Sequence, residues 1–343
     1  MKKILYYVTD HGRGHATRTV AITRELKKLD VEITIRNSNQ FEFFNKSLPN
    51  IKILSGQTDV GPIIKKNGIS IDREQSISLL NNWIDNLENI SLNEFESVSK
   101  YHPDLIISDI SPMPFLVAKK MKIPSIAISN FSWYDVLDFL SDQKLEKLDE
   151  AYSEASYVIK LPLSTPLEHF KNSKDVGFVS RKPIKKDFEI RKQLNIKDSE
   201  KLVFLALGDS EDVFDINFDK EMKVVSTGTK IKKCDDLISL PNYVEGQDLV
   251  AASDLVIAKC GYGVISESLN SNTPFVYVFD EFHKEQNTMH NSLCNLGLQN
   301  NIGFDELQNI VFDHDFIKKT RSLPKKKIDT SNVVNFLQEE LFR

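Results

Sequence analysis

Short apolar runs alternate with stretches of helical periodicity from the start of the chain. Residues 3–8 form the first apolar run, and apolar side chains then recur at helical spacing from Ala16 to Leu29. Further apolar or β-branched runs that predict strands lie at residues 31–35, 51–54, 104–108, 125–128 and 157–159. This alternation predicts a parallel sheet covered by helices on both faces.

Proline-containing stretches at residues 161–166 and 181–183 interrupt the pattern, and the alternation starts again at residue 201. We therefore predict an α/β protein with two doubly wound, Rossmann-like domains and an interdomain cleft. The predicted division is a first domain over 1–165, a linker over 166–183, a second domain over 184–326, and a C-terminal helix within 327–343 that packs back on the first domain.

Glycine and proline break the periodicity within the first predicted domain. Residues 56–70 contain Gly56, Gly61, Pro62 and Gly68, which predicts a long loop. A loop of this length in a compact domain is usually functional or mobile. We expect the ligand specificity of this domain to depend on this loop and on the helix that follows it, and neither carries a recognisable sequence motif.

Composition narrows the functional classes. The 343 residues are 41% hydrophobic and 27% charged, which is ordinary for a soluble globular protein, and the net charge of −5 gives no support for nucleic-acid binding. The three cysteines lack metal-ligand spacing, and the first apolar run is too short for a signal peptide, so we expect a cytoplasmic protein with reduced thiols. The basic clusters at 318–321 and 325–327 suit solvated loops, with peripheral contact to an anionic membrane as the alternative.

A glycine turn follows the first predicted strand and leads into a helix. Gly12 and Gly14 precede His15 in this turn, and Asp109 ends the fourth predicted strand. In a doubly wound sheet the first and fourth strands are neighbours, so His15 and Asp109 are expected across one crevice. His15 then suits a general base that Asp109 orients, with His11 as a competitor and helix capping or anion binding as the simpler interpretation.

A second glycine turn lies between a predicted strand and a helix in the second domain. The sequence Gly261-Tyr262-Gly263 allows backbone N–H groups to approach a diphosphate. Ser266 and Glu267 follow within two helical turns. The Glu267 carboxylate suits ribose hydroxyls, although an acidic residue early in a helix is also favoured by the helix dipole.

These motifs resemble a known family. Residues 10–18 resemble the start of GT-B-fold glycosyltransferases related to family 28, and residues 256–267, 273–276 and 285–286 resemble that family's donor-binding signature. The resemblance is closer still to the glycosyltransferase-like N-terminal region of plant-type L-arabinokinases, through residues 108–109, 130–133 and 251–263. The kinase half of those proteins has no counterpart in this sequence.

The resemblance implies a metal-independent hexosyltransferase without a cofactor. The implied donor is a nucleotide sugar, UDP-GlcNAc-like, and the implied acceptor is a hydroxyl of a glycan, a lipid-linked molecule or a small molecule. The implied catalytic residues are His15 and Asp109. On the acceptor side the resemblance and the pattern together single out His11, Gly12, Gly14, Asn130 and Ser132, and on the donor side Gly208, Ser210, Lys259, Gly261, Tyr262, Gly263, Ser266, Glu267, Glu285 and Gln286.

One loop departs from the family pattern. Where family 28 members often carry a Gly-Gly-Ser loop, residues 208–212 read Gly-Asp-Ser-Glu-Asp. Three carboxylates would repel a diphosphate unless they turn away or contact sugar hydroxyls. Two alternatives therefore stand beside the transferase: a non-catalytic protein that binds a sugar nucleotide, and an enzyme resembling UDP-sugar 2-epimerases. The sequence does not indicate which oligomeric state the protein adopts.

Overall fold

The computed structural model describes residues 1–208, 210–232, 237–240, 243–320 and 329–342. The chain divides into two compact units. The first unit comprises residues 1–63, 72–179 and the C-terminal segment from 328, and the second comprises residues 64–71 and 180–327. The predicted Asp209, Cys234, Arg321 and the basic cluster 325–327 lie outside the described residues.

The first unit is built on a seven-stranded sheet in the order β3-β2-β1-β4-β5-β6-β7, with every pair parallel. This order confirms the predicted doubly wound arrangement, in which the first and fourth strands are neighbours. The strands are β1 (Lys2–Val8), β2 (Val31–Asn37), β3 (Lys52–Ser55), β4 (Leu105–Asp109), β5 (Ser125–Ser129), β6 (Tyr157–Lys160) and β7 (Ser173–Asp175).

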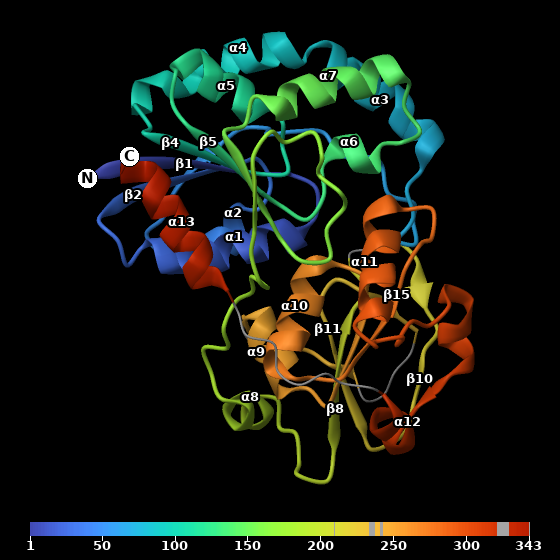
Figure 1. The fold of residues 1–343 in the computed structure, drawn as a ribbon. Coiled ribbons are helices and arrows are strands. Elements are labelled where there is room, and N and C mark those ends of the chain that lie inside the picture. The colour runs from blue at the N-terminus through green and yellow to red at the C-terminus, as the bar shows by residue number, and fades with distance from the viewer. Residues whose placement is uncertain (209, 233–236, 241–242, 321–328, 343) are drawn as a thin grey trace. The chain divides into compact units, whose positions relative to one another are not determined.

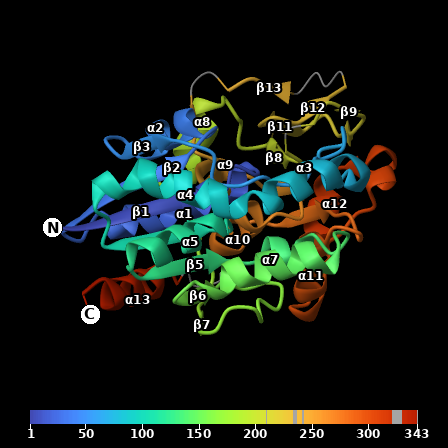
Figure 2. The same ribbon diagram turned by 90° about the horizontal axis from the view of Figure 1, so that it is seen from above.

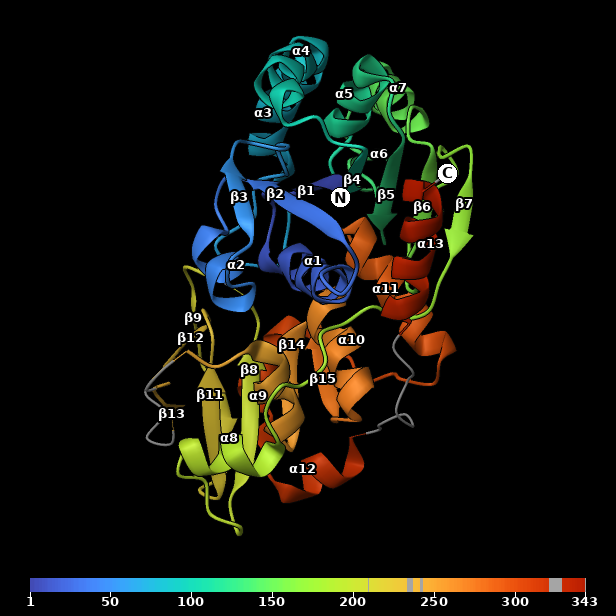
Figure 3. The ribbon, with the colours of Figure 1, turned by 90° about the vertical axis from the view of Figure 1, so that its left-hand side faces the viewer.

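Helices cover both faces of this sheet, because its central strands are apolar on both sides. Figures 1 and 3 show α1 (Arg13–Leu26), α2 (Phe41–Ser47) and α13 (Thr330–Phe342) on one face. The other face carries α3 (Arg73–Asp85), α4 (Leu87–Val98), α5 (Met113–Met121) and α7 (Asp142–Ser153), seen from above in Figure 2. The short α6 (Trp133–Val136) follows β5, and the turn η1 (Ser99–Tyr101) precedes β4.

The second unit has a five-stranded parallel sheet in the order β13-β11-β8-β14-β15. Its strands are β8 (Lys201–Ala206), β11 (Met222–Ser226), β13 (Leu237–Ile238), β14 (Leu255–Lys259) and β15 (Phe275–Val278). Two small pairs join β9 (Val213–Phe214) to β12 (Lys230–Ile231) and β10 (Asn217–Phe218) to β16 (Val311–Phe312). The helices are α8 (Asp187–Gln193), α9 (Gly246–Ala252), α10 (Tyr262–Ser271), α11 (Lys284–Asn295), η2 (Phe304–Asn309) and α12 (His314–Lys319).

The structure departs from the predicted division at two places. Residues 166–179, predicted to be linker, belong to the first unit, because β7 pairs with β6 at the edge of the first sheet. Residues 64–71 belong to the second unit, although residues 64–70 were predicted to be part of a loop of the first domain. The physical reason is Ile69, which is 3% exposed within the second unit's apolar core. The C-terminal α13 packs against α1 in the first unit.

Candidate active site

A glycine in a backbone conformation that other residues rarely adopt places His15. Gly12 has φ of +80° and stands directly before α1. The chain can therefore turn sharply after β1, and α1 begins at Arg13. His15 lies in the first turn of this helix and is 8% exposed. Gly14 is the second residue of α1, and its carbonyl accepts a hydrogen bond from the Thr17 hydroxyl.

His15 and Asp109 are in direct contact, as the strand order led us to expect. Val8 at the end of β1 pairs in register with Asp109 at the end of β4. The His15 Nδ1 atom lies 2.9 Å from Asp109 Oδ1, and the Asp109 side chain is fully buried. Residues that are 94 positions apart in the chain thus form one buried pair.

Arg18 completes this pair and was not predicted from the sequence. Its Nε donates to Asp109 Oδ2 at 2.5 Å and its Nη2 donates to Asp109 Oδ1 at 2.6 Å. Its Nη1 donates to the side-chain oxygen of Asn130, a predicted acceptor-side residue. The spacing of three residues after His15 places Arg18 on the same helix face, and this was the signal available in the sequence.

Two opposing effects set the charge of Asp109. Burial alone would raise the pKa of this carboxyl, but the charge and hydrogen bonds of Arg18, with a smaller contribution from His15, hold its pKa below the usual range. Asp109 is therefore a carboxylate at neutral pH. Arg18 Nη2 also lies 2.8 Å from His15 Nδ1. Because arginine only donates, the tautomer of His15 decides whether Nδ1 donates to Asp109 or accepts from Arg18.

Aromatic rings line the same edge of the first sheet. Phe131 lies 5.5 Å from the His15 ring, Trp133 lies 5.3 Å from Phe131, and His11 lies 5.4 Å from Trp133, all edge to face. The predicted Ser132 lies between the two aromatic residues and caps α6, where its hydroxyl accepts from the Asp135 N–H. Its position is therefore structural in this arrangement.

A buried carboxyl that the sequence analysis did not identify links these segments. Asp59 Oδ1 accepts from Thr9 Oγ1 at 2.8 Å and from the Asp10 N–H at 3.1 Å, and Oδ2 accepts from Trp133 Nε1 at 2.9 Å. Burial outweighs these hydrogen bonds and raises the pKa of Asp59 from 3.8 to about 6. No motif in residues 56–70 could have indicated it.

This pKa predicts a pH dependence of stability. The folded state binds the Asp59 proton more tightly than the unfolded state, so the free energy of unfolding falls as pH rises from about 4 to about 6. A pKa difference of about two units corresponds to about 3 kcal/mol. We expect urea unfolding between pH 4 and 7 to show this loss in the parent protein and not in Asp59→Asn. The exposed Asp30→Asn is the matched control, and an unchanged pH dependence in Asp59→Asn would contradict the assignment.

The glycine turn of the second unit lies where it was predicted. Gly261 caps the N-terminus of α10, and Tyr262 and Gly263 form its first residues. The hydroxyl of Ser266 donates to the Gly263 carbonyl at 2.9 Å, so it is bonded within its own helix. The start of this ten-residue helix presents the backbone N–H groups that anions favour.

Glu267 is 4% exposed and is bound to an arginine that sequence analysis placed in the linker. Arg181 Nε donates to Glu267 Oε1 at 2.7 Å, and Arg181 Nη1 donates to Glu245 Oε2 at 2.8 Å. The predicted ribose carboxylate therefore belongs to a buried ion cluster. A ribose hydroxyl would share this carboxylate with Arg181.

The remaining predicted donor residues follow the strand ends of the second sheet. Ser210 Oγ donates to the Asp212 carbonyl at 2.9 Å, close after Gly208 in the loop that follows β8. Lys259 ends β14, while Glu285 and Gln286 lie in the first turn of α11. Gln286 is 3% exposed and its Oε1 accepts from the Asp280 N–H at 3.0 Å.

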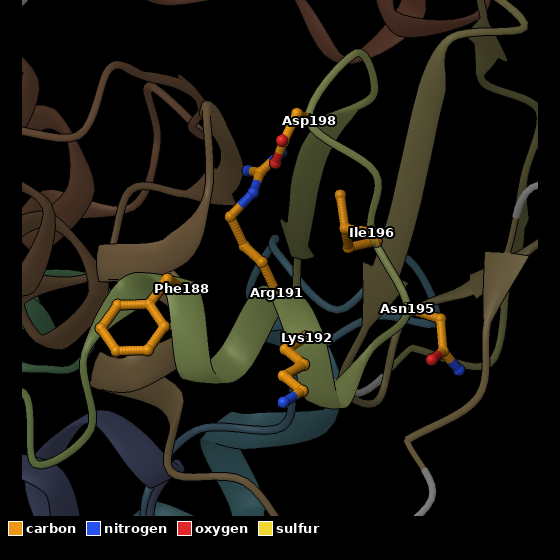
Figure 4. Close-up of a pocket in the computed structure, with 6 residues that line it drawn as sticks. All are labelled: Phe188, Arg191, Lys192, Asn195, Ile196 and Asp198. Atoms are coloured by element: carbon orange, nitrogen blue, oxygen red, sulfur yellow. The ribbon is translucent and has the colours of Figure 1, made fainter.

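Two surface hollows lie apart from every predicted site residue. Figure 4 shows one beside α8, a cavity of about 390 Å³ lined by Phe188, Arg191, Lys192, Asn195, Ile196 and Asp198. The other, in the first unit, has a volume of about 490 Å³ and includes Phe95, His102 and Lys120. Neither contains a residue with a proposed role.

Within the described residues, no group of three or more His, Cys, Asp or Glu side chains is placed to hold a metal ion. In the same part of the chain, no helix combines the length and apolar character needed to cross a membrane. Cys260 and Cys294 are free thiols. The expectations of no cofactor and no metal requirement stay predictions.

The chain is similar in sequence and in fold to known proteins. Residues 2–171 match the model of Glycosyl transferase family 1. The glycotransferase of kitacinnamycin aligns with a TM-score of 0.63 at 13% identity, over 99% of both chains. The chain has the GT-B fold of these glycosyltransferases. A UDP-glucosyltransferase from Polygonum tinctorium shares the GT-B fold with a TM-score of 0.61 at 12% identity, over 100% of this chain and 99% of that one.

A relative with greater sequence similarity is much longer. The GT-B chain is 28% identical over 311 residues to L-arabinokinase from Arabidopsis thaliana. The alignment covers 84% of this chain and 29% of that protein, so the chain spans less than a third of that relative's length. This confirms the resemblance stated from the motifs, while the relation to family 28 stays a prediction.

Proposed function

We propose that this protein transfers a sugar from a nucleotide-diphosphate donor, UDP-GlcNAc or a similar UDP-sugar, to an acceptor hydroxyl. The observation that carries the proposal is the buried pair of His15 and Asp109 at the end of the first sheet. The match to Glycosyl transferase family 1 and the shared fold with a UDP-glucosyltransferase support it.

His15 acts as the general base in this proposal. With the proton on Nδ1 donated to Asp109, the Nε2 atom keeps its lone pair for an acceptor O–H. The acceptor oxygen attacks the anomeric carbon, the bond from that carbon to the diphosphate oxygen breaks, and the proton passes to His15. Asp109 stabilises the imidazolium that forms, and Arg18 keeps Asp109 ionised.

The second unit binds the donor in this proposal. The N-terminus of α10, with Gly261 and Gly263, favours the charge that develops on the leaving diphosphate. Lys259 at the end of β14 adds a cation on the same sheet edge. These groups supply the charge stabilisation that a metal ion gives in other transferases, so we propose that transfer is metal-independent.

A two-step experiment tests this function. Thermal unfolding is followed with UMP, UDP, UDP-glucose and UDP-GlcNAc, because a ligand that binds the folded state raises Tm by mass action. The nucleotide sugar that raises Tm most is then incubated with hydroxyl acceptors, and the product masses are measured by mass spectrometry. We expect a Tm increase with UDP-sugars and a product that carries one added sugar.

The outcomes separate the alternatives. Binding without transfer to any acceptor indicates a non-catalytic sugar-nucleotide-binding protein. A changed sugar in the absence of acceptor indicates an epimerase. No Tm shift with any nucleotide contradicts the proposed donor class.

A further inference from the structure

Residues 64–71 form a hairpin that belongs to the second unit although it lies in the first half of the chain. Ile64 and Ile71 pair in an antiparallel bridge, and the Lys65 N–H donates to the Ser70 carbonyl at 2.8 Å. The turn is closed by Asn67, whose Oδ1 accepts from the N–H groups of Ile69 and Ser70 at 2.9 and 3.0 Å. We call this segment the 64–71 hairpin.

One apolar side chain anchors the 64–71 hairpin. Ile69 is 3% exposed and is part of the core cluster of the second unit, which includes Leu207 and Val278. An isoleucine at the tip of an otherwise polar turn gains about 1.5–3 kcal/mol from such burial. The position of the hairpin on the second unit is therefore fixed by its own sequence.

Three carbonyl groups of the 64–71 hairpin accept hydrogen bonds from three segments of the predicted donor side. The Lys66 carbonyl accepts from the N–H groups of Glu211 and Asp212 at 3.0 and 3.3 Å. The Gly68 carbonyl accepts from Lys259 Nζ at 3.3 Å. The Ile69 carbonyl accepts from Gln286 Nε2 at 3.0 Å.

These contacts give Gln286 and the acidic loop defined positions. Gln286 donates to Ile69 through its amide nitrogen and accepts from the Asp280 N–H through its oxygen, so both ends of the amide are fixed. The N–H groups at residues 211 and 212 point to Lys66, and Glu211 forms an exposed ion pair with the Lys66 side chain at 3.4 Å. Residues 211–212 are thereby tied to the hairpin.

We propose that the 64–71 hairpin is a positioning element of the nucleotide-sugar site, an inference that rests on the proposed function. Its carbonyls orient Lys259 and Gln286 and hold the backbone of residues 211–212. Asn67 and Ile69 are the positioning residues, because one shapes the turn and the other anchors it. Neither is assigned a contact with the substrate.

The test weakens the turn of the 64–71 hairpin and leaves the side chains of its partners Lys259 and Gln286 unchanged. Asn67→Ala removes the acceptor for two N–H groups, and we expect the affinity for UDP-GlcNAc to fall about tenfold. Affinity for UMP, which lacks the second phosphate and the sugar, is expected to change less than twofold. Lys65→Ala, at an exposed side chain of the same hairpin, is the matched control and should bind both ligands as the parent does. Titration calorimetry measures the affinities of the parent and both variants for the two ligands.

The outcomes separate a failure of the hairpin proposal from a failure of the proposed function. Equal or tighter UDP-GlcNAc binding by Asn67→Ala overturns the hairpin proposal, and so does an equal loss for UMP, which indicates general damage to the fold. If the parent binds no nucleotide sugar, the proposed function fails first and the role of the hairpin with it. Should Asn67→Ala not fold, Ile69→Val trims the anchor by one methyl group, and it must shift UDP-GlcNAc affinity in the same direction.

Discussion

Replacing His15 by alanine is expected to lower the turnover number for sugar transfer by about 10²–10⁴-fold, the usual contribution of a general base. The Kd of the UDP-sugar should stay within twofold of the parent value, because the residues proposed to bind the donor belong to the second unit. Single-turnover transfer and calorimetry measure the two quantities separately. We expect the loss of turnover because His15 is the histidine that Asp109 orients, with 2.9 Å between His15 Nδ1 and Asp109 Oδ1.

His11→Ala is the matched control for this experiment. His11 contacts Trp133 edge to face at 5.4 Å, whereas the histidine 2.9 Å from Asp109 is His15. Its loss should act mainly on the KM of the acceptor. If His11→Ala removes turnover and His15→Ala does not, the base has been assigned to the wrong histidine.

Arg18→Met is expected to destabilise the first unit by about 3–5 kcal/mol at pH 7, since it leaves the buried carboxylate of Asp109 without its charge partner. Urea unfolding followed by tryptophan fluorescence isolates this unit, because both tryptophans, Trp83 and Trp133, lie in it. A cost below about 1 kcal/mol would show that the ion pair is not needed for stability.

A double variant and the pH dependence of stability test whether the unpaired charge of Asp109 causes this destabilisation. Asp109→Asn added to Arg18→Met removes the unpaired charge, so we expect the double variant to be more stable than Arg18→Met alone. In the parent the pKa of Asp109 is lowered, so its stabilising contribution is present above the unfolded pKa and is lost as pH falls. Without Arg18 the sign reverses, and the deficit of Arg18→Met should shrink toward pH 4.

The strand order was predictable because it follows from general rules of parallel sheets. Alternation of apolar runs and helical patterns places the first and fourth strands side by side, and this brings His15 to Asp109. No knowledge of side-chain packing was needed for that step. The same rule placed Gly261 at the start of a helix after a strand.

The hydrogen-bond and ion-pair partners of the site residues could not be predicted from the sequence. Arg18 has the right helical spacing to face Asp109, but an arginine on a helix is usually solvated, so its burial is a tertiary effect. Asp59 lies in a loop with no periodicity, and its three hydrogen bonds come from residues 49 or more positions away. The bond from Gln286 to Ile69 spans 217 positions and has no local signature.

The 64–71 hairpin also determines which segments must be exchanged together when chimeras are made between relatives. The chain passes from one unit to the other after residue 63, returns after residue 71, and crosses again after residue 179. A chimera that joins the first 179 residues of one relative to the remainder of another would therefore combine a hairpin from one parent with the Lys259 and Gln286 partners of the other. Recombination that preserves donor preference must move residues 64–71 together with the second unit, even though they are encoded more than 100 residues earlier.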